Sequence, residues 1–101
     1  VNGELCYAWY LKGTILGNQK LHEDALAAYL KAEQLSNDIP AVLFSIANTY
    51  DAMGQYETAY QYCQRIAVLM PDVDHGGDLY GVIHHNKKLM SALEKELGIG
   101  G

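Results

Sequence analysis

Apolar residues recur along this chain at three- and four-residue intervals, in five stretches separated by polar or breaker residues. This spacing predicts five helices, over about Glu4 to Leu16, His22 to Leu35, Pro40 to Gly54, Tyr56 to Met70 and Asp78 to Leu97. Pro40 suits a first helical turn, where no amide donor is needed, and Pro71 ends the fourth helix. Gly17-Asn18 suits a left-handed stop after the first helix. Asp72 to Gly77 is expected to be the longest loop.

The sequence also repeats itself after 34 residues. A shift by this amount aligns structurally important pairs: Trp9 with Leu43, Gly13 with Ala47, Leu16 with Tyr50, His22 with Tyr56 and Ala25 with Ala59. A fixed period of this length is typical of stacked helix–turn–helix units. Small residues inside helices indicate places where two backbones approach closely, since glycine there costs about 1 kcal/mol relative to alanine. We therefore expect Gly13 to pack against the alanines of the following helix.

The repeated residues resemble those of the tetratricopeptide repeat family. The first unit carries Trp9, Gly13, Leu16, Ala25, Tyr29 and Ala32, and the second carries Ile46, Ala47, Tyr50, Gly54, Tyr56, Ala59 and Pro71. Departures from the family pattern are Lys12, Asn37, Cys63 and Ile66. The resemblance implies an all-α fold, a right-handed superhelical stack of two antiparallel helix–turn–helix hairpins plus a C-terminal capping helix. The whole chain, 1–101, would form one domain, with repeats at 6–39 and 40–73.

The last segment, 74–101, is expected to be a capping helix, and a degenerate third hairpin is the alternative. Its apolar residues share one face: Leu79, Val82, Ile83, Met90, Leu93 and Leu97. Its polar residues face away: Lys87, Lys88, Ser91, Glu94 and Lys95. Terminal repeats of stacked arrays need such a polar outer face. Gly81 keeps the repeat phase, whereas Leu93 occupies the column of Ala25 and Ala59.

The amino-acid composition and net charge restrict the class of partner that the protein can bind. The formal net charge is −5 with seven Lys and Arg, so there is no basic footprint for nucleic acid. Acidity instead favours a neutral, apolar or basic protein segment. No stretch approaches the roughly 18 apolar residues that span a membrane. Two distant cysteines make no disulfide framework, and no leader pattern opens the chain, so we expect a reducing, cytoplasmic location with Cys63 as a small core residue.

Because a fold alone gives no function, the candidate site comes from the resemblance. In such arrays the first helix of each hairpin lines a concave groove that binds a peptide of a partner protein. The positions expected to bind peptide here are Tyr7, Tyr10, Thr14, Phe44, Asn48 and Asp51, flanked by Asn18, Asp78, Val82 and His85. The alternative for Tyr7 and Tyr10 is that they only cover the end of the stack. The resemblance therefore implies a non-catalytic protein-interaction module.

One class of ligand is excluded. Some family members bind the acidic tails of chaperones with a clamp of basic residues, but the positions of those basic residues hold Tyr10, Thr14, Asp78 and Val82 here.

Two further roles remain as alternatives. The run Asp51 to Tyr56 is similar to chaperones of type III secretion translocators, which hold a secreted or membrane-inserting client. A self-assembling scaffold, in which a groove or an array end binds another copy, is the second alternative and implies a homo-oligomer.

An enzyme or metal site has less support. The nearest candidates are His75, His84 and His85, with Asp72, Asp74 and Asp78. Adjacent helical residues such as His84 and His85 point about 100° apart, and no zinc-binding spacing is present. No serine or cysteine has a base placed by a recognisable motif. We therefore expect no catalytic residue, no metal and no cofactor.

Overall fold

Helices make up nearly all of the described chain. The computed structural model describes residues 2–36, 38–69 and 77–99, with side chains from Glu4 onward in the first helix and from Val82 onward in the last. Over these ranges the helices are α1 (Asn2–Asn18), α2 (His22–Leu35), α3 (Pro40–Ala52), α4 (Tyr56–Leu69) and α5 (Gly77–Leu97), and there is no strand. The predicted all-α stack of hairpins is confirmed.

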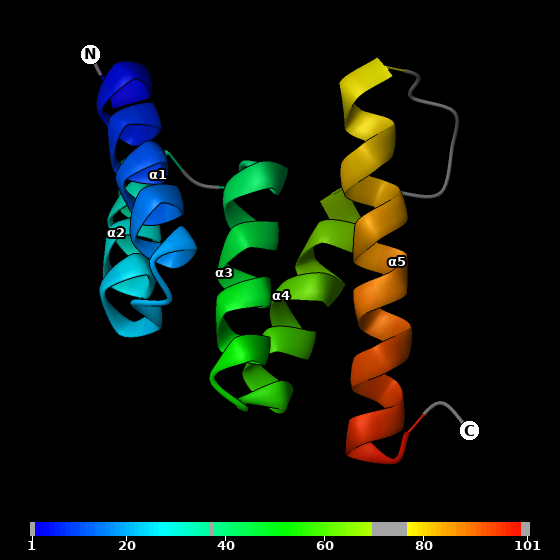
Figure 1. Cartoon of the computed structure of the whole chain (residues 1–101). Helices are drawn as coiled ribbons and strands as arrows, with labels where there is room; N and C mark the ends of the chain where they lie inside the picture. The colour runs from blue at the N-terminus through cyan, green and yellow to red at the C-terminus, as the bar shows by residue number, and fades with distance from the viewer. Residues whose placement is uncertain (1, 37, 70–76, 100–101) are drawn as a thin grey trace.

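The helices form two successive hairpins and a final single helix. Helix α1 packs against α2, and α3 packs against α4. Helix α2 joins the two hairpins through its contact with α3, and α5 packs on both α4 and α3. Helices α1, α3 and α5 follow one another across the view, with α2 behind α1 and α4 behind the space between α3 and α5 (Figure 1). The molecule measures 42 × 31 × 20 Å along its principal axes.

The turn after α1 differs from the prediction, because Gly17 and Asn18 remain helical. The left-handed residue is Lys20, with φ of 66°. The Leu21 amide donates to the Leu16 carbonyl at 3.0 Å, and the Lys20 amide donates to the Gly17 carbonyl at 2.9 Å. These two bonds form a Schellman motif, in which a left-handed residue ends the helix.

The second hairpin repeats this turn in phase. Gly54, which follows Lys20 by 34 positions, has φ of 80°. The Gln55 amide donates to the Tyr50 carbonyl at 2.9 Å, and the Gly54 amide donates to the Asp51 carbonyl at 3.0 Å. The repeat therefore extends to the backbone hydrogen bonds of the turn, although only the second copy uses the residue type that fits a left-handed conformation at no steric cost.

Gly13 marks the close approach within the first hairpin, but its partner is not the predicted alanine. A β-carbon added at Gly13 would lie 2.7 Å from both Cδ1 and Cε1 of Tyr29. The missing side chain thus leaves room for the face of an aromatic ring. Gly17 is the glycine that faces an alanine, since a β-carbon there would lie 3.8 Å from Cβ of Ala25.

The second hairpin achieves its close contact through alanines and a thiol. Ala47, Ala59, Cys63 and Leu93 are all fully buried in one cluster. Leu93 of α5 therefore fills the space beside the small residues of α3 and α4. This packing confirms Cys63 as a core residue.

Helix α5 is one helix over Gly77–Leu97, which fits the expected capping helix. Residues 72–76 of the predicted loop lie outside the described part of the chain. Glu94 was expected to face away, but it accepts a hydrogen bond from the Tyr60 hydroxyl at 2.8 Å. Asn86 is buried, and its amide donates to the Cys63 carbonyl at 3.1 Å. Polar groups thus help to join α5 to α4.

The close approach at Gly13 gives a stability prediction. Gly13→Ala should lower the free energy of unfolding by about 1 kcal/mol or more, because the clash with Tyr29 outweighs the gain in helix propensity. Gly17→Ala is the matched control and should raise it by up to about 1 kcal/mol, since its β-carbon finds an ordinary contact. Urea unfolding followed by circular dichroism measures both values. Equal stabilisation of the two variants would contradict the packing of Gly13 on the ring.

The buried thiol gives a pH prediction. Burial, with a smaller contribution from the Asp51 carboxylate, raises the pKa of the Cys63 thiol to about 12. An unfolded thiol has a pKa of about 8.5, so above that pH the unfolded chain loses a proton that the native protein keeps. The free energy of unfolding should therefore fall by about 1–2 kcal/mol between pH 8 and pH 10 through this group. Below pH 8 the Cys63 thiol contributes no pH dependence to the free energy of unfolding.

Comparison with Cys63→Ala isolates this effect from the titration of other groups. The difference in unfolding free energy between wild type and variant should shrink as the pH rises from 8 to 10. Parallel pH profiles would mean that the thiol ionises as readily in the native state as in the unfolded state.

Candidate functional site

The predicted residues of α1 form a group of aromatic rings supported by hydroxyl groups. The rings of Tyr7 and Tyr10 are stacked with centroids 6.4 Å apart, and Tyr10 lies 5.9 Å from Tyr29. The Thr14 hydroxyl donates to the Tyr10 carbonyl at 3.0 Å and accepts from the Tyr29 hydroxyl at 3.2 Å. Tyr7 is 59% exposed, whereas Tyr10 and Thr14 are half-buried. The surface available to a ligand here is therefore mostly tyrosine ring.

A second aromatic group lies between α3 and α5. The Phe44 ring is half-buried against the core residues Leu43, Ile66 and Ile83. Its other neighbour is the exposed imidazole of His85, with ring centroids 6.2 Å apart. Val82 packs on the same cluster. Phe44 thus contributes to folding as well as to the surface, which the sequence pattern did not indicate.

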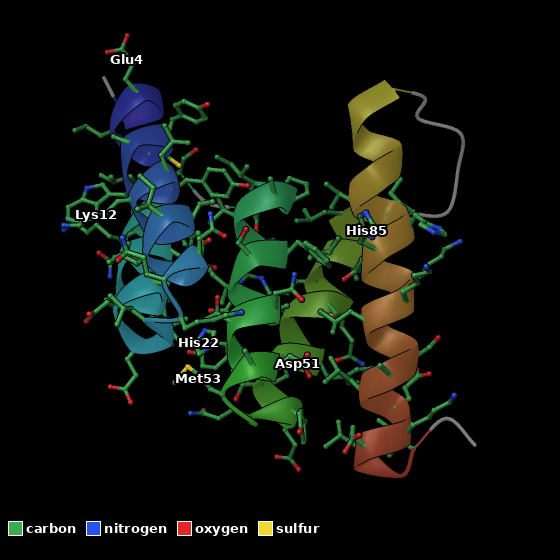
Figure 2. The ribbon with its side chains drawn as sticks, viewed as in Figure 1. Glu4, Lys12, His22, Asp51, Met53 and His85 are labelled. Carbon is green, nitrogen blue, oxygen red and sulfur yellow. The ribbon has the colours of Figure 1, made fainter. Side chains whose placement is uncertain are left out.

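The polar candidates lie along α3, after Phe44. Asn48 is exposed one turn further on, and Asp51 follows it as a half-buried carboxylate. Figure 2 shows Asp51 on α3 and His85 on α5, the helix beside it. Asn18 is exposed at the end of α1. The predicted role of Asp78 concerns a side chain outside the described residues.

These groups share one side of the stack, which we call the α1–α3–α5 face: Tyr7, Tyr10, Thr14, Phe44, Asn48, Asp51, Val82 and His85. Helix α3 contacts both α1 and α5, so the tyrosine group and the Phe44 group lie on neighbouring helices. The exposed amide of Asn48 stands on the middle helix. The face therefore offers the tyrosine rings of α1 and the Phe44 ring of α3, with the Asn48 amide one turn after Phe44 on the same helix.

The Tyr29 hydroxyl was not among the groups expected to face the groove, whereas His85 was expected there as a flanking residue. Tyr29 belongs to the repeat pattern, which assigns it to the core and gives no sign of its bond to Thr14. The expectation for His85, which lies three residues after Val82 on α5, did not include its contact with the Phe44 ring. Both residues shape the face through contacts with another helix, Tyr29 of α2 with Thr14 of α1 and His85 of α5 with Phe44 of α3.

An ionic cluster on α2 and α4 has a structural role. The Arg65 guanidinium donates to Glu33 at 2.7 Å and to Asp38 at 3.0 Å, and it lies 5.2 Å from the centroid of the Tyr62 ring. The Tyr62 hydroxyl also donates to Glu33 at 3.3 Å. The cluster joins the first hairpin to the second, and its charges are already paired.

A hollow of about 590 Å³ lies at the turns between helices, lined by Lys20, Leu21, His22, Glu23, Asp24, Met53 and Gln55. Figure 2 places His22 and Met53 beside each other at this end of the molecule. Both basic and acidic side chains line this hollow, and none of the residues predicted to bind peptide lines it. Among the described residues, no group of three His, Cys, Asp or Glu side chains is placed to hold a metal ion. The protonated thiol of Cys63 is a poor nucleophile.

No helix within the described ranges is both long enough and apolar enough to span a membrane. A search of curated proteins finds no match to this chain. The family model described as the tetratricopeptide repeat matches residues 7–39 and 40–67. These two matches coincide with the α1–α2 and α3–α4 hairpins. Repeats of this kind generally mediate protein–protein interactions and are not catalytic. The chain belongs to the tetratricopeptide repeat family.

Proposed function

We propose that the α1–α3–α5 face binds a peptide segment of a partner protein in an extended or helical conformation. The observation that carries this proposal is the placement of an exposed amide, Asn48, one turn after Phe44 on α3, the helix that contacts both α1 with its tyrosine group and α5. Such a face combines apolar contact area with a group that can both donate and accept hydrogen bonds. Tyrosines suit this role, since they supply large contact areas at low entropic cost.

The tyrosine group is held in place before any ligand arrives. Tyr10 lies between the rings of Tyr7 and Tyr29, and Thr14 fixes the Tyr29 hydroxyl. A ring that is already oriented loses little freedom on binding, so more of the contact energy appears as affinity. Phe44 is held in the same way by its packing against the core.

The charge of the protein restricts the kinds of peptide that this face can bind. The chain has a formal net charge of −5, and Asp51 adds a carboxylate beside Asn48 on α3. An acidic peptide would be repelled, whereas neutral, apolar or basic segments would not. We therefore propose a partner segment with apolar side chains for the rings and basic or neutral flanks.

The test begins with peptides selected on the wild-type protein from a random display library. Tyr7→Ala and Asn48→Ala are the informative variants, because both side chains are exposed and their loss should leave folding intact. Tyr7→Ala should weaken binding by about 1–3 kcal/mol as a lost aromatic anchor. Asn48→Ala should weaken it about fivefold, the equivalent of one hydrogen bond of about 1 kcal/mol. Isothermal titration calorimetry measures the affinities.

Two controls complete this test. Gln61→Ala, an exposed change on α4, should leave affinity unchanged. Phe44→Ala should weaken binding but also lower the melting temperature, because Phe44 is half-buried. Unchanged affinity in both Tyr7→Ala and Asn48→Ala would place the peptide elsewhere and contradict the proposal.

A further inference from the structure

Helix α1 is apolar on two opposite sides, although only one of them is covered. The covered side includes Cys6 and Gly13 and packs against α2. The other side, which we call the outer face of α1, comprises Glu4, Leu5, Ala8, Leu11, Lys12 and Ile15, all exposed. Its three large aliphatic side chains, those of Leu5, Leu11 and Ile15, are 50%, 41% and 58% exposed. A helix that is apolar all round is normally buried.

The equivalent residues of the second repeat indicate whether positions on the outer face of α1 are normally buried. The 34-residue shift places Ala8, Lys12 and Ile15 on Val42, Ile46 and Thr49 of α3. Those three α3 residues are all buried, 3%, 0% and 8% exposed respectively. Val42 and Ile46 share a core cluster with residues of the first hairpin, including Ala25, Tyr29 and Ala32. Ala8, Lys12 and Ile15 of the outer face therefore occupy columns that, in α3, are buried against other helices.

The two ends of the stack are not alike. Helix α5 presents exposed polar residues at the far end, including Lys88, Ser91 and Lys95. Head-to-tail stacking would set the aliphatic outer face of α1 against these lysines and desolvate them. A contact between the outer faces of two copies avoids this desolvation of lysines. It also places the same surface of each copy in contact, as a two-fold interface requires.

We propose that the outer face of α1 binds the outer face of a second copy of this chain, with the two α1 helices antiparallel about a two-fold axis near Ala8. This arrangement brings Glu4 of each copy level with Lys12 of the other, because the two positions are equally distant from Ala8. It also places Ala8 opposite Ala8, where a small side chain permits close approach. A parallel pairing would instead set Glu4 against Glu4 and Lys12 against Lys12.

The charged pair is available for this contact. The Lys12 ammonium lies 5.0 Å from the centroid of the Trp9 ring, which holds it beside the aliphatic residues. Figure 2 shows Lys12 on the side of α1 away from α3, and Glu4 near the N-terminal end of the helix. The interface leaves Tyr10, Thr14 and α3 uncovered, whereas Tyr7 lies beside Glu4 and Leu11 on α1, at the border between the outer face and the peptide-binding face.

Sedimentation equilibrium of residues 1–101 at several concentrations tests the proposal. Wild type should associate reversibly to a dimer. Leu11→Glu should weaken association by about a hundredfold or more, because each dimer would then hold two unpaired carboxylates in an apolar contact. Val68→Glu is the matched control, since Val68 is a 79% exposed aliphatic residue on α4, and it should dimerise like wild type. Melting curves confirm that the variants fold.

Charge exchange tests the antiparallel pairing. Glu4→Lys and Lys12→Glu should each weaken self-association by about tenfold, since two attractive pairs become repulsive. A mixture of these two variants should form a heterodimer, because each pair of charges across the interface again joins a lysine to a glutamate. A double variant that carries both changes should dimerise like wild type.

Three results would overturn the proposal. A monomeric wild type at all concentrations would leave the outer face of α1 to a helix of another protein or to a further repeat. A dimer unaffected by Leu11→Glu would place the interface on another surface. A mixture of Glu4→Lys and Lys12→Glu that associates no better than either variant alone would exclude the antiparallel pairing.

Discussion

The contact between Gly13 and the Tyr29 ring sets the geometry of the first hairpin. Because no side chain stands at position 13, the ring can lie against the backbone of α1, at a distance that even a methyl group would not allow. The Tyr29 hydroxyl then reaches Thr14, and the ring lies beside Tyr10. One missing side chain thus determines both how closely α1 and α2 pack and where the tyrosine group of the candidate site lies.

The second hairpin reaches a similar arrangement with different residues. Ala47 and Ala59 supply the close contact, and Leu93 of α5 fills the space beside them. Helix α5 therefore completes the core at one end and turns its polar side outward. At the other end, the outer face of α1 is exposed in the part of the chain that the structure describes, and it keeps the aliphatic character of a packing surface. The physical difference between the two ends lies in which helix faces are covered.

The sequence predicted the helices well, because the proline and glycine positions and the 3.6-residue period are local signals. His22 and Leu35 were correct as the ends of α2, and α5 is one helix as expected. The turn at Lys20 was missed, because it is defined by backbone hydrogen bonds and not by a glycine. The partner of Gly13 was also missed, since a small residue shows that something approaches closely without showing what.

The candidate site was predictable only as a set of positions. Helical spacing placed Tyr7, Tyr10, Phe44 and Asn48 on the first helices of the hairpins. It could not show that Phe44 is half-buried or that the Thr14 hydroxyl is engaged by Tyr29, because both facts depend on contacts between helices. The exposure of the outer face of α1 was likewise not predicted, since periodicity does not tell which apolar side of a helix is covered.

We have proposed that partner peptides bind across the α1–α3–α5 face. The most direct measurement is nuclear magnetic resonance of nitrogen-15-labelled protein titrated with a peptide selected from a display library. If the peptide binds this face, the largest changes in amide chemical shift will occur in residues 7–14, 44–51 and 82–85. Changes confined to α2 and the exposed side of α4, around Gln61 and Gln64, would contradict this proposal.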